Sequence, residues 1–329
     1  MENIRIKSVA IYHPENKVNN EFYLNHFDNQ GKDIRRLLEG YGRNERYIVD
    51  NDFDNTATMG AKASLRALKE ANLRGEDIDI ILFSSSMPEF TAPTQALFVH
   101  SVIKGKAEAM VMDTNVNCVG MIASVDTAVR YLQTNDEYKR ALIIGSDYMS
   151  VHCKDNDELT YPQFGDLACA VILEKTTEDS AFLGSKYLTN SDEWGIVRYP
   201  NCGTSKAYDD IHENEKKLFW TPFDGSFICN HAKDSIDFLL HKNNLKMEDI
   251  KLFCVSQFAK GIGLGCIEAF GVDESKVPYI GDRYGYTGTS SPFLVLHEMI
   301  KEGKINRGDY VAFWSVGTNW TTSAVLIKY

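Results

Sequence analysis

Cys118 stands in a position that suits a catalytic nucleophile. An apolar segment ending at Asp113 comes shortly before it, and a segment with helical periodicity, 119–133, follows it. The sulfur is therefore expected at a helix N-terminus, where free backbone N–H groups and the helix dipole favour a thiolate over a thiol. Gly120 would let a substrate approach the backbone closely. The alternative is a small buried cysteine without a chemical role.

Three other segments could carry chemistry. The run 281–292 is polar, rich in glycine and hydroxyl groups, and leads into a helix, so it is either a functional loop or a helix cap. Asp166, in Phe164-Gly165-Asp166, is expected to form a structural turn before a strand. The run 261–265 has part of a dinucleotide-binding pattern, but Cys266 takes the place of the last glycine, so no nucleotide is expected there.

Composition excludes several classes of protein. The 329 residues carry 35 Lys and Arg against 46 Asp and Glu, a formal net charge of −11. Such an acidic surface repels nucleic-acid phosphates and anionic lipid. No apolar run is long enough to cross a bilayer, and residues 1–5 do not begin a signal peptide. Seven cysteines without a CxxC pair or zinc-type cluster fit a reducing compartment. We therefore expect a cytoplasmic globular protein without a metal or bound cofactor, and no nucleic-acid or membrane partner.

The candidate residues lie in a chain that alternates between helical and strand patterns. Residues 56–72 have apolar side chains at helical spacing, and 77–83 form a short apolar run typical of a buried strand. The same order recurs as a strand at 109–113, a helix at 119–133 and a strand at 140–145. Strands separated by helices predict an α/β protein whose sheet is covered on both faces.

An internal repeat divides the chain. The string Asn72-Leu-Arg-Gly-Glu-Asp-Ile returns as Asn244-Leu-Lys-Met-Glu-Asp-Ile, each time between a helix and an apolar strand that leads to a serine. The closing strands also match, with 170–175 resembling 324–328. Two matches in the same order indicate a duplication. We expect similar α/β halves at 1–178 and 215–329, joined by a connecting segment, 179–214.

These features together resemble β-ketoacyl-acyl-carrier-protein synthase III of the thiolase superfamily. The resemblance rests on Cys118 at a strand-to-helix turn, Phe164-Gly165-Asp166 before an Ala-rich strand, and Tyr284-Gly285-Tyr286-Thr287 in the later loop. It extends over nearly the whole chain, with shorter matches at 42–47, 224–225 and 317–320. It implies a thiolase-like fold in which two duplicated halves are stacked in α-β-α-β-α layers.

The resemblance assigns catalytic roles and shows where this chain departs from the family. Cys118 matches the nucleophile that takes an acyl group from a thioester. The family histidine falls on Ser256 and the family asparagine on Tyr286, so two of the three chemical groups are replaced. Tyr286 keeps a hydrogen-bond donor, whereas the Ser256 hydroxyl cannot act as a base near neutral pH. The expected substrate-binding neighbours are Gln257, Gly317 and Thr318.

The resemblance also bears on the acyl donor. The family residues that sandwich the adenine of coenzyme A fall on Arg36 and Gly40, which favours a carrier-protein donor over acyl-coenzyme A. Arg36 stays a candidate to bind a donor phosphate. Possible contacts to an acyl carrier protein are Lys251, Lys260 and Arg43.

A dimer is expected, because family members extend one sheet across two protomers. The partner is a second copy of this chain or another thiolase-fold chain, and the segment 87–94 would reach the partner's acyl pocket. Ala92 stands there in place of a bulky residue, which predicts a roomy substrate-binding pocket. Nearby Glu89 lies in the region that supplies a base in related enzymes.

Two functions fit these residues. In the first, the chain is an acyltransferase or atypical ketosynthase of fatty-acid-like or polyketide metabolism, which loads an acyl group onto Cys118 and passes it to an acceptor. In the second, it is a catalytically impaired subunit of a ketosynthase or C-acyltransferase complex, because the family histidine and asparagine are missing. Ordinary decarboxylative condensation is the least expected activity.

Overall fold

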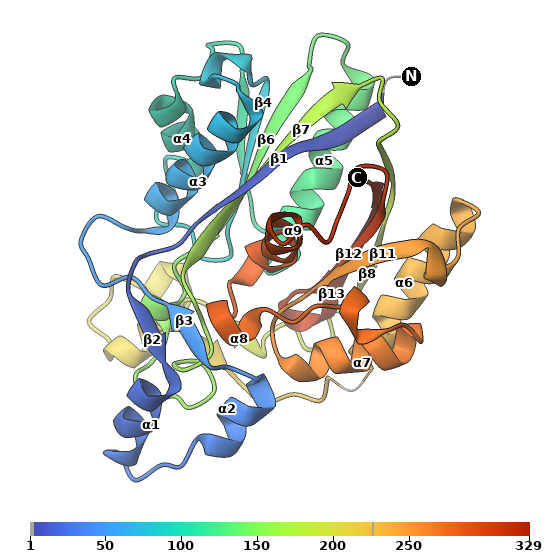
Figure 1. Ribbon diagram of the computed structural model, residues 1–329. Coiled ribbons are helices and arrows are strands. Elements are labelled where there is room, and N and C mark those ends of the chain that lie inside the picture. Colours follow the sequence, from blue (N-terminus) through green and yellow to red (C-terminus); the bar gives the residue numbers. More distant parts are fainter. Residues whose placement is uncertain (1–2, 226) are drawn as a thin grey trace.

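The computed structural model describes residues 3–225 and 227–329, which form two β-sheets with helices between and around them (Figure 1). The strands of the first sheet are β1 (Asn3–Tyr12), β4 (Ile80–Ser84), β5 (Met110–Thr114), β6 (Arg140–Asp147) and β7 (Leu167–Thr176). Those of the second are β8 (Ala181–Thr189), β11 (Ile250–Val255), β12 (Tyr310–Val316) and β13 (Thr321–Lys328). The expectation about a signal peptide falls partly on residues 1–2, outside this description.

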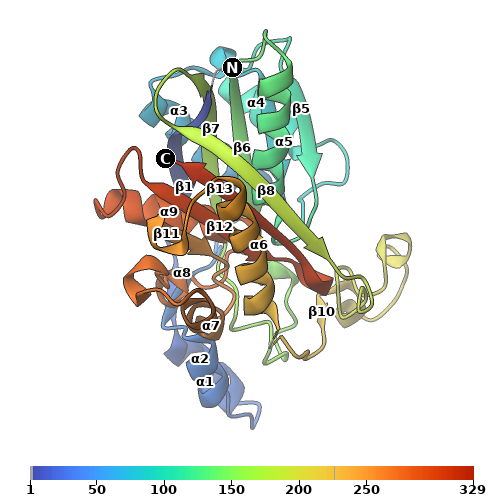
Figure 2. The same ribbon diagram turned by 90° about the vertical axis from the view of Figure 1, so that its right-hand side faces the viewer.

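The helices form three layers, which alternate with the two sheets. The outer face of the first sheet is covered by α3 (Thr56–Ala71) and α4 (Gln95–Ile103). Between the sheets lie α5 (Gly120–Thr134) and α9 (Ser291–Lys301), whose buried side chains share one core with strands of both sheets. The outer face of the second sheet is covered by α6 (Ile228–Lys242) and α7 (Lys260–Phe270) (Figure 2). The expected α-β-α-β-α order is confirmed.

Smaller elements border the layers. The strands β2 (Lys17–Asn19) and β3 (Glu45–Tyr47) pair in antiparallel fashion. The chain between them forms the helices α1 (Asn20–Asp28) and α2 (Arg35–Tyr41), and α2 contacts α7. The short strands β9 (Val197–Arg198) and β10 (Phe219–Trp220) pair with each other, and α8 (Gly281–Tyr284) precedes α9. No helix within 3–225 or 227–329 is long and apolar enough to cross a membrane.

The predicted elements near the nucleophile are present with small shifts at their ends. The helix expected at 56–72 is α3, which begins where the Asn55 side chain accepts the Thr58 N–H at 2.9 Å. The helix expected at 119–133 is α5, and the three strands around it are β4, β5 and β6. The parallel pairing of β4 with β5 and β6 brings the ends of these strands to one edge of the sheet, beside Cys118.

The repeat detected in the sequence is a repeat in the structure. Asn72 and Asn244 both have left-handed backbones, with φ of 54° and 55°. In each copy an aspartate five residues later accepts a backbone N–H, at 2.8 and 2.7 Å. The strand order β1-β7-β6-β4 in the first half corresponds to β8-β13-β12-β11 in the second. The same local sequence therefore builds the same turn into a buried parallel strand twice.

The expected division of the chain needs one correction. β8 lies within the segment 179–214, which was expected only to connect the halves, yet it pairs with β13 along its length. In the sheet it occupies the place that β1 has in the first half. Its side chains are mostly half-buried at the sheet edge, so it lacks the continuous apolar run that would have identified it as a strand. The second half thus begins near Ala181, and its strands are interrupted by the connecting residues 190–218.

Candidate active site

Cys118 lies at the turn between β5 and α5, as its sequence position predicts. Asn117 before it has a left-handed φ of 51°, which makes the sharp turn into the helix. The Cys118 carbonyl accepts a hydrogen bond from Ser315 Oγ of β12 at 3.0 Å. A Cβ on Gly317 would lie 3.2 Å from Asn117 Cβ, so the turn after β12 packs directly on the turn that contains Asn117 and Cys118. The two halves of the fold thus hold the cysteine between them.

The role expected for Gly120 needs correction. Its Cα faces the protein interior, where a Cβ would collide with Ser84 Oγ at the end of β4 and lie 3.2 Å from Thr289 Oγ1. The next N–H, of Met121, donates to the same Thr289 oxygen at 2.7 Å. Gly120 therefore allows α5 to pack closely on β4, and it does not open the backbone to a substrate.

The expectation of a favoured thiolate also needs correction. Burial raises the pKa of the Cys118 thiol from 9.0 to about 12, and the buried carboxylate of Asp147 acts in the same direction. A helix N-terminus contributes at most about 2 kcal/mol, roughly a 30-fold change in an ionisation constant. The burial effect is larger, about a thousandfold. Cys118 therefore rests as a protonated thiol.

Three donors nevertheless face the sulfur. The Tyr286 hydroxyl and the backbone N–H groups of Cys118 and Thr318 hydrogen-bond to it, and each lowers the pKa of the thiol against the effect of burial. Burial raises the pKa of Tyr286 well above its ordinary value, so this side chain acts as a neutral donor. Donors arranged in this way can stabilise negative charge that develops on a substrate oxygen or on the sulfur.

Tyr286 is positioned by the Phe164-Gly165-Asp166 turn. The Gly165 N–H donates to the Tyr286 carbonyl at 3.0 Å, and the Tyr286 N–H donates to the Gln163 carbonyl at 3.1 Å. A Cβ on Gly165 would collide with the Tyr284 carbonyl oxygen, so only glycine allows this approach. Asp166 accepts hydrogen bonds from Val49 N at 2.9 Å and from Ser150 Oγ at 2.6 Å, in agreement with the structural role expected for it.

Ser256 directly follows β11 and is buried beside Tyr286. Its N–H donates to the Trp314 carbonyl at 2.9 Å. Its Oγ has no hydrogen bond of ordinary geometry within the described chain, although the Tyr286 hydroxyl lies close enough to interact with it. The structure thus brings together Cys118, Tyr286 and Ser256, the three predicted catalytic residues.

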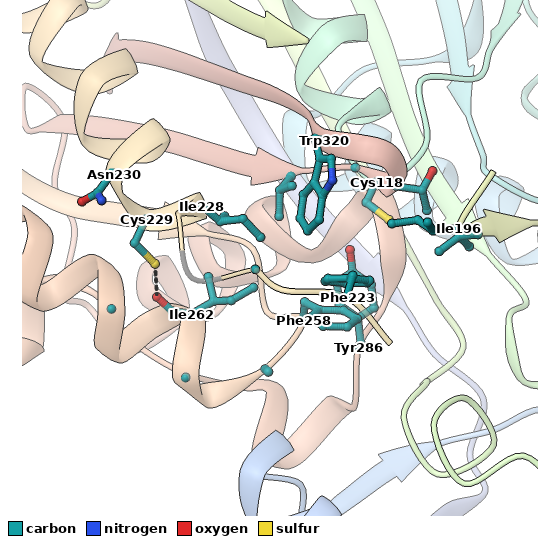
Figure 3. A pocket seen from close by; sticks show the side chains of 18 of the residues that line it. Cys118, Ile196, Phe223, Ile228, Cys229, Asn230, Phe258, Ile262, Tyr286 and Trp320 are labelled. Atoms are coloured by element: carbon teal, nitrogen blue, oxygen red, sulfur yellow. Dashed lines mark hydrogen bonds between the residues drawn. The ribbon is translucent and has the colours of Figure 1, made fainter. Parts of the chain in front are cut away.

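Two cavities meet at Cys118. The larger, about 660 Å³, extends from Cys118 and Tyr286 to the facing ends of α6 and α7 (Figure 3). The smaller, about 350 Å³, lies under the connecting segment and also reaches Met87. Both are lined by Cys118, Val197, Trp220 and Thr318. Cys118 is therefore the point at which the two cavities meet.

The wall of the larger cavity is aromatic, which the sequence did not indicate. Its rings are Trp220, Phe223, Phe258 and Trp320. The Trp220 and Phe258 rings stack with centroids 5.5 Å apart, and the Phe258 ring meets Tyr286 edge-on at 5.3 Å. Trp320 has an unusual left-handed φ of 66°, and its indole N–H donates to Glu193 at 2.7 Å. These rings come from three segments far apart in the chain, so no spacing in the sequence could have grouped them all.

Comparisons with known proteins agree with this geometry. Residues 112–191 match the family model of 3-oxoacyl-[acyl-carrier-protein] synthase III, and residues 240–329 match the model of its C-terminal part. The β-ketoacyl-[acyl-carrier-protein] synthase III of Staphylococcus aureus (strain Newman) is 28% identical over 328 residues, 99% of both chains. The crystal structure of the Aquifex aeolicus VF5 synthase III, 25% identical, covers 99% of this chain and 100% of its own with a TM-score of 0.87.

The chain is a synthase III-like member of the thiolase superfamily.

The thiolase-like fold extends to more distant structures. OleA of Xanthomonas campestris, 18% identical, has a TM-score of 0.86 and is covered over 98% of its chain. At this identity the likeness concerns the fold alone. The resemblance seen in the motifs is thus confirmed for the family and for the fold.

In this synthase III-like chain, the structure does not support substrate binding by Gln257. Its side chain is buried and lines neither cavity at Cys118. The amide oxygen accepts the Ile280 N–H at 2.8 Å, and the amide nitrogen donates to the Val255 carbonyl at 2.9 Å. Gln257 therefore ties β11 to the loop before α8. Gly317 and Thr318 do line the larger cavity, as expected.

Arg43 is not a surface contact for a carrier protein. It is 1% exposed, and its guanidinium donates to the Gln257 carbonyl at 3.0 Å and to the Phe258 carbonyl at 2.6 Å. These bonds hold the loop after β11 in place. Lys251 and Lys260 are exposed, and Lys260 also lines a polar surface cavity of about 570 Å³.

The remaining predicted residues are exposed. Arg36 lies on the surface of α2, while its neighbour Arg35 lines the polar cavity near Lys260. Ala92 and Glu89 lie in the exposed loop before α4 and line neither cavity at Cys118. Roles for Arg36, Ala92 and Glu89 thus stay predictions, and those of Ala92 and Glu89 depend on a second chain.

Proposed function

We propose that this chain is an acyl-transferring enzyme in which Cys118 takes an acyl group from a thioester and passes it to a second substrate. The observation that carries the proposal is the meeting of two cavities at one sulfur that faces three hydrogen-bond donors. A site built only for binding would not need donors converging on a thiol at the junction of two channels.

In the first step, Cys118 Sγ attacks the thioester carbonyl carbon. A C–S bond forms to Cys118 and the carbonyl oxygen gains negative charge. We expect the Thr318 and Cys118 N–H groups, which face the sulfur, to donate hydrogen bonds to this oxygen. The intermediate collapses by breaking the donor's C–S bond. The proton of Cys118 leaves with the donor sulfur, because no described residue lining either cavity is a histidine or lysine.

In the second step, the acyl group passes from Cys118 to an acceptor that enters by the other cavity. Tyr286 donates its hydrogen bond to the thiolate that is released, and this thiolate takes the proton that the acceptor loses, which restores the Cys118 thiol. Without the family histidine, we expect an acceptor that is already nucleophilic and not one activated by decarboxylation, which points to specialised fatty-acid-like or polyketide metabolism. We expect the donor to be an acyl carrier protein thioester or an acyl-coenzyme A thioester, and the names of the relatives contain the first of these carriers.

We infer that the chain works as a dimer, with itself or with another thiolase-fold chain. β5 is the edge strand of the first sheet, and its residues are only half-buried. Next to it, α4 exposes Leu97, Phe98 and Val102 by 48%, 37% and 37%. An unpaired edge strand beside exposed apolar side chains is typical of an interface that continues the sheet.

The second candidate, an impaired subunit, is favoured by one observation. The pKa of Cys118 is raised, Tyr286 is neutral, and none of the described residues lining either cavity is a histidine or lysine, so the thiol has no obvious base. In that case, the partner chain would supply the complete site, and this chain would load no acyl group by itself.

Intact-protein mass spectrometry distinguishes the two. The purified chain is incubated with a panel of acyl-coenzyme A and acyl-carrier-protein donors, beside Cys118→Ala and the control Cys202→Ala, whose cysteine lines neither cavity. An acyl-sized mass gain on the wild type and on Cys202→Ala, but not on Cys118→Ala, is expected. No gain from any donor would refute loading by the chain alone and favour the subunit.

A further inference from the structure

Cys229, which lines the larger cavity, and Cys266 behind it form a pair of free thiols. Cys229 belongs to the first turn of α6, and Cys266 lies on α7. Their Sγ atoms are 3.9 Å apart, with the Cys266 thiol donating to the Cys229 sulfur. The Cys229 thiol in turn donates to the Ile262 carbonyl at 3.6 Å (Figure 3). Neither residue has a part in the acyl-transfer steps described above.

The two thiols differ in access. Cys229 lines the cavity, so a small molecule that enters the substrate path meets its sulfur. Cys266 is fully buried behind it. The hydrogen bond that Cys229 accepts from Cys266 lowers the pKa of Cys229, whereas the pKa of Cys266 is raised. The accessible thiol is thus the one that ionises first, as in an attacking and resolving pair.

Helices α6 and α7 pack closely beside this pair of thiols. A Cβ built on Gly265, the residue before Cys266, would lie 2.7 Å from Cys229 Sγ. Disulfides join Cβ atoms about 3.5–4.5 Å apart with an S–S bond of about 2.05 Å. To form the bond, the two sulfurs must approach each other by about 2 Å. Rotations about the two Cα–Cβ bonds can supply part of this movement without separating the helices.

We propose that Cys229 and Cys266 are a thiol-oxidation site that forms a reversible disulfide, with a hydroperoxide as the oxidant. The Cys229 thiolate attacks one peroxide oxygen and breaks the O–O bond, which gives a sulfenic acid and, for hydrogen peroxide, hydroxide. The Cys266 sulfur then attacks the Cys229 sulfur, an S–S bond forms, and the sulfenic oxygen leaves with the two remaining protons as water. Both thiols are oxidised, and one peroxide is reduced to two waters.

The disulfide would fasten α6 to α7 in the wall of the cavity that leads to Cys118. The site rests on the geometry of the thiol pair and does not depend on the proposed acyl transfer. Its test therefore uses no acyl donor, and its failure would leave the proposed function untouched.

The test treats the folded chain with one to a few equivalents of hydrogen peroxide, removes the excess with catalase, and alkylates the remaining thiols. It uses Cys118→Ala, so that oxidation of the nucleophile does not interfere. We expect intact mass to show the loss of two hydrogens and two fewer alkylated thiols. Peptide mapping should find a Cys229–Cys266 link, and dithiothreitol should restore both thiols.

Two variants in the same background make the test specific. Cys229→Ser should form no disulfide, and Cys266→Ser should stop at a sulfenic acid on Cys229, which dimedone traps. Full alkylation of both thiols after peroxide treatment would overturn the proposal, as would a disulfide that links other cysteines. The mapping on the Cys118→Ala protein decides the question even if a serine variant folds poorly.

Discussion

Cys118 carries its proton at rest because its sulfur is buried, and this gives its reactivity a defined pH dependence. The reactive form is the thiolate, whose fraction rises about tenfold per pH unit as long as the pH stays below the pKa. With a pKa raised to about 12, we expect the rate of alkylation by iodoacetamide to rise continuously from pH 6 to pH 10. An ordinary cysteine would level off near pH 8.5–9.5. Site-resolved mass spectrometry gives the rate, and a plateau at Cys118 below pH 9 would show that the thiolate is stabilised in solution.

Ser256 is predicted to stand in place of the family histidine and Tyr286 in place of the family asparagine. Their hydroxyl groups differ in the hydrogen bonds that they make. Tyr286→Phe removes a hydrogen bond that lowers the pKa of the Cys118 thiol, and we expect acyl loading to slow by roughly 10- to 100-fold, as for loss of a hydrogen bond to a charged group. Ser256→Ala removes an Oγ that has no well-formed hydrogen bond in the described chain, so loading should slow by less than about tenfold. Stopped time points read by intact mass measure both. Equal losses would mean that the two hydroxyls act as one unit.

At the scale of elements, contact between two loops places Tyr286. Gly165 faces the Tyr284 carbonyl, and a Cβ at this position collides with backbone that cannot move alone. We expect Gly165→Ala to lower the free energy of unfolding by about 1–3 kcal/mol and to reduce acyl loading, because Tyr286 shifts with the loop. Urea denaturation and the mass assay measure the two effects.

Gly261→Ala is the matched control, since a Cβ at Gly261 would meet nothing within 4 Å. In helix α7, alanine should leave the free energy of unfolding unchanged or raise it by up to about 1 kcal/mol. If both alanine variants were equally stable, the close approach of the two loops would not be tight enough to require glycine.

At the scale of the whole molecule, the exposed side chains of α4 beside the β5 edge predict a sheet that continues into a second chain. We expect the wild type to sediment at twice the mass of one chain, and Phe98→Asp to sediment at the mass of one chain, because a charge cannot be buried unpaired in an apolar interface. Leu264→Asp, on an exposed α7 residue outside both cavities at Cys118, is the control and should leave the mass unchanged. If the purified wild type were a monomer, the partner at this edge would have to be another thiolase-fold chain and not a second copy of this one.

Much of the architecture could be predicted from local sequence. Helical and strand periodicities located α3, α5, β4, β5 and β6, because each is a continuous segment with one buried face or a fully buried core. The duplicated string at Asn72 and Asn244 was recognisable because its turn is built from neighbouring residues alone, a left-handed asparagine and an aspartate that accepts a nearby N–H. β8 was not recognised, because an edge strand with half-buried side chains has no strong pattern.

The sequence by itself determined the family, and it predicted Cys118 as the nucleophile with Ser256 and Tyr286 in place of the family's histidine and asparagine, since these depend on residue types at fixed spacing. Only the tertiary structure decided the surroundings of Cys118. The burial that raises the pKa of Cys118, the aromatic wall around Trp220 and the approach of Cys229 to Cys266 each arise from segments far apart in the chain. Burial and contact are properties of packed neighbours, and local sequence does not specify which neighbours will meet.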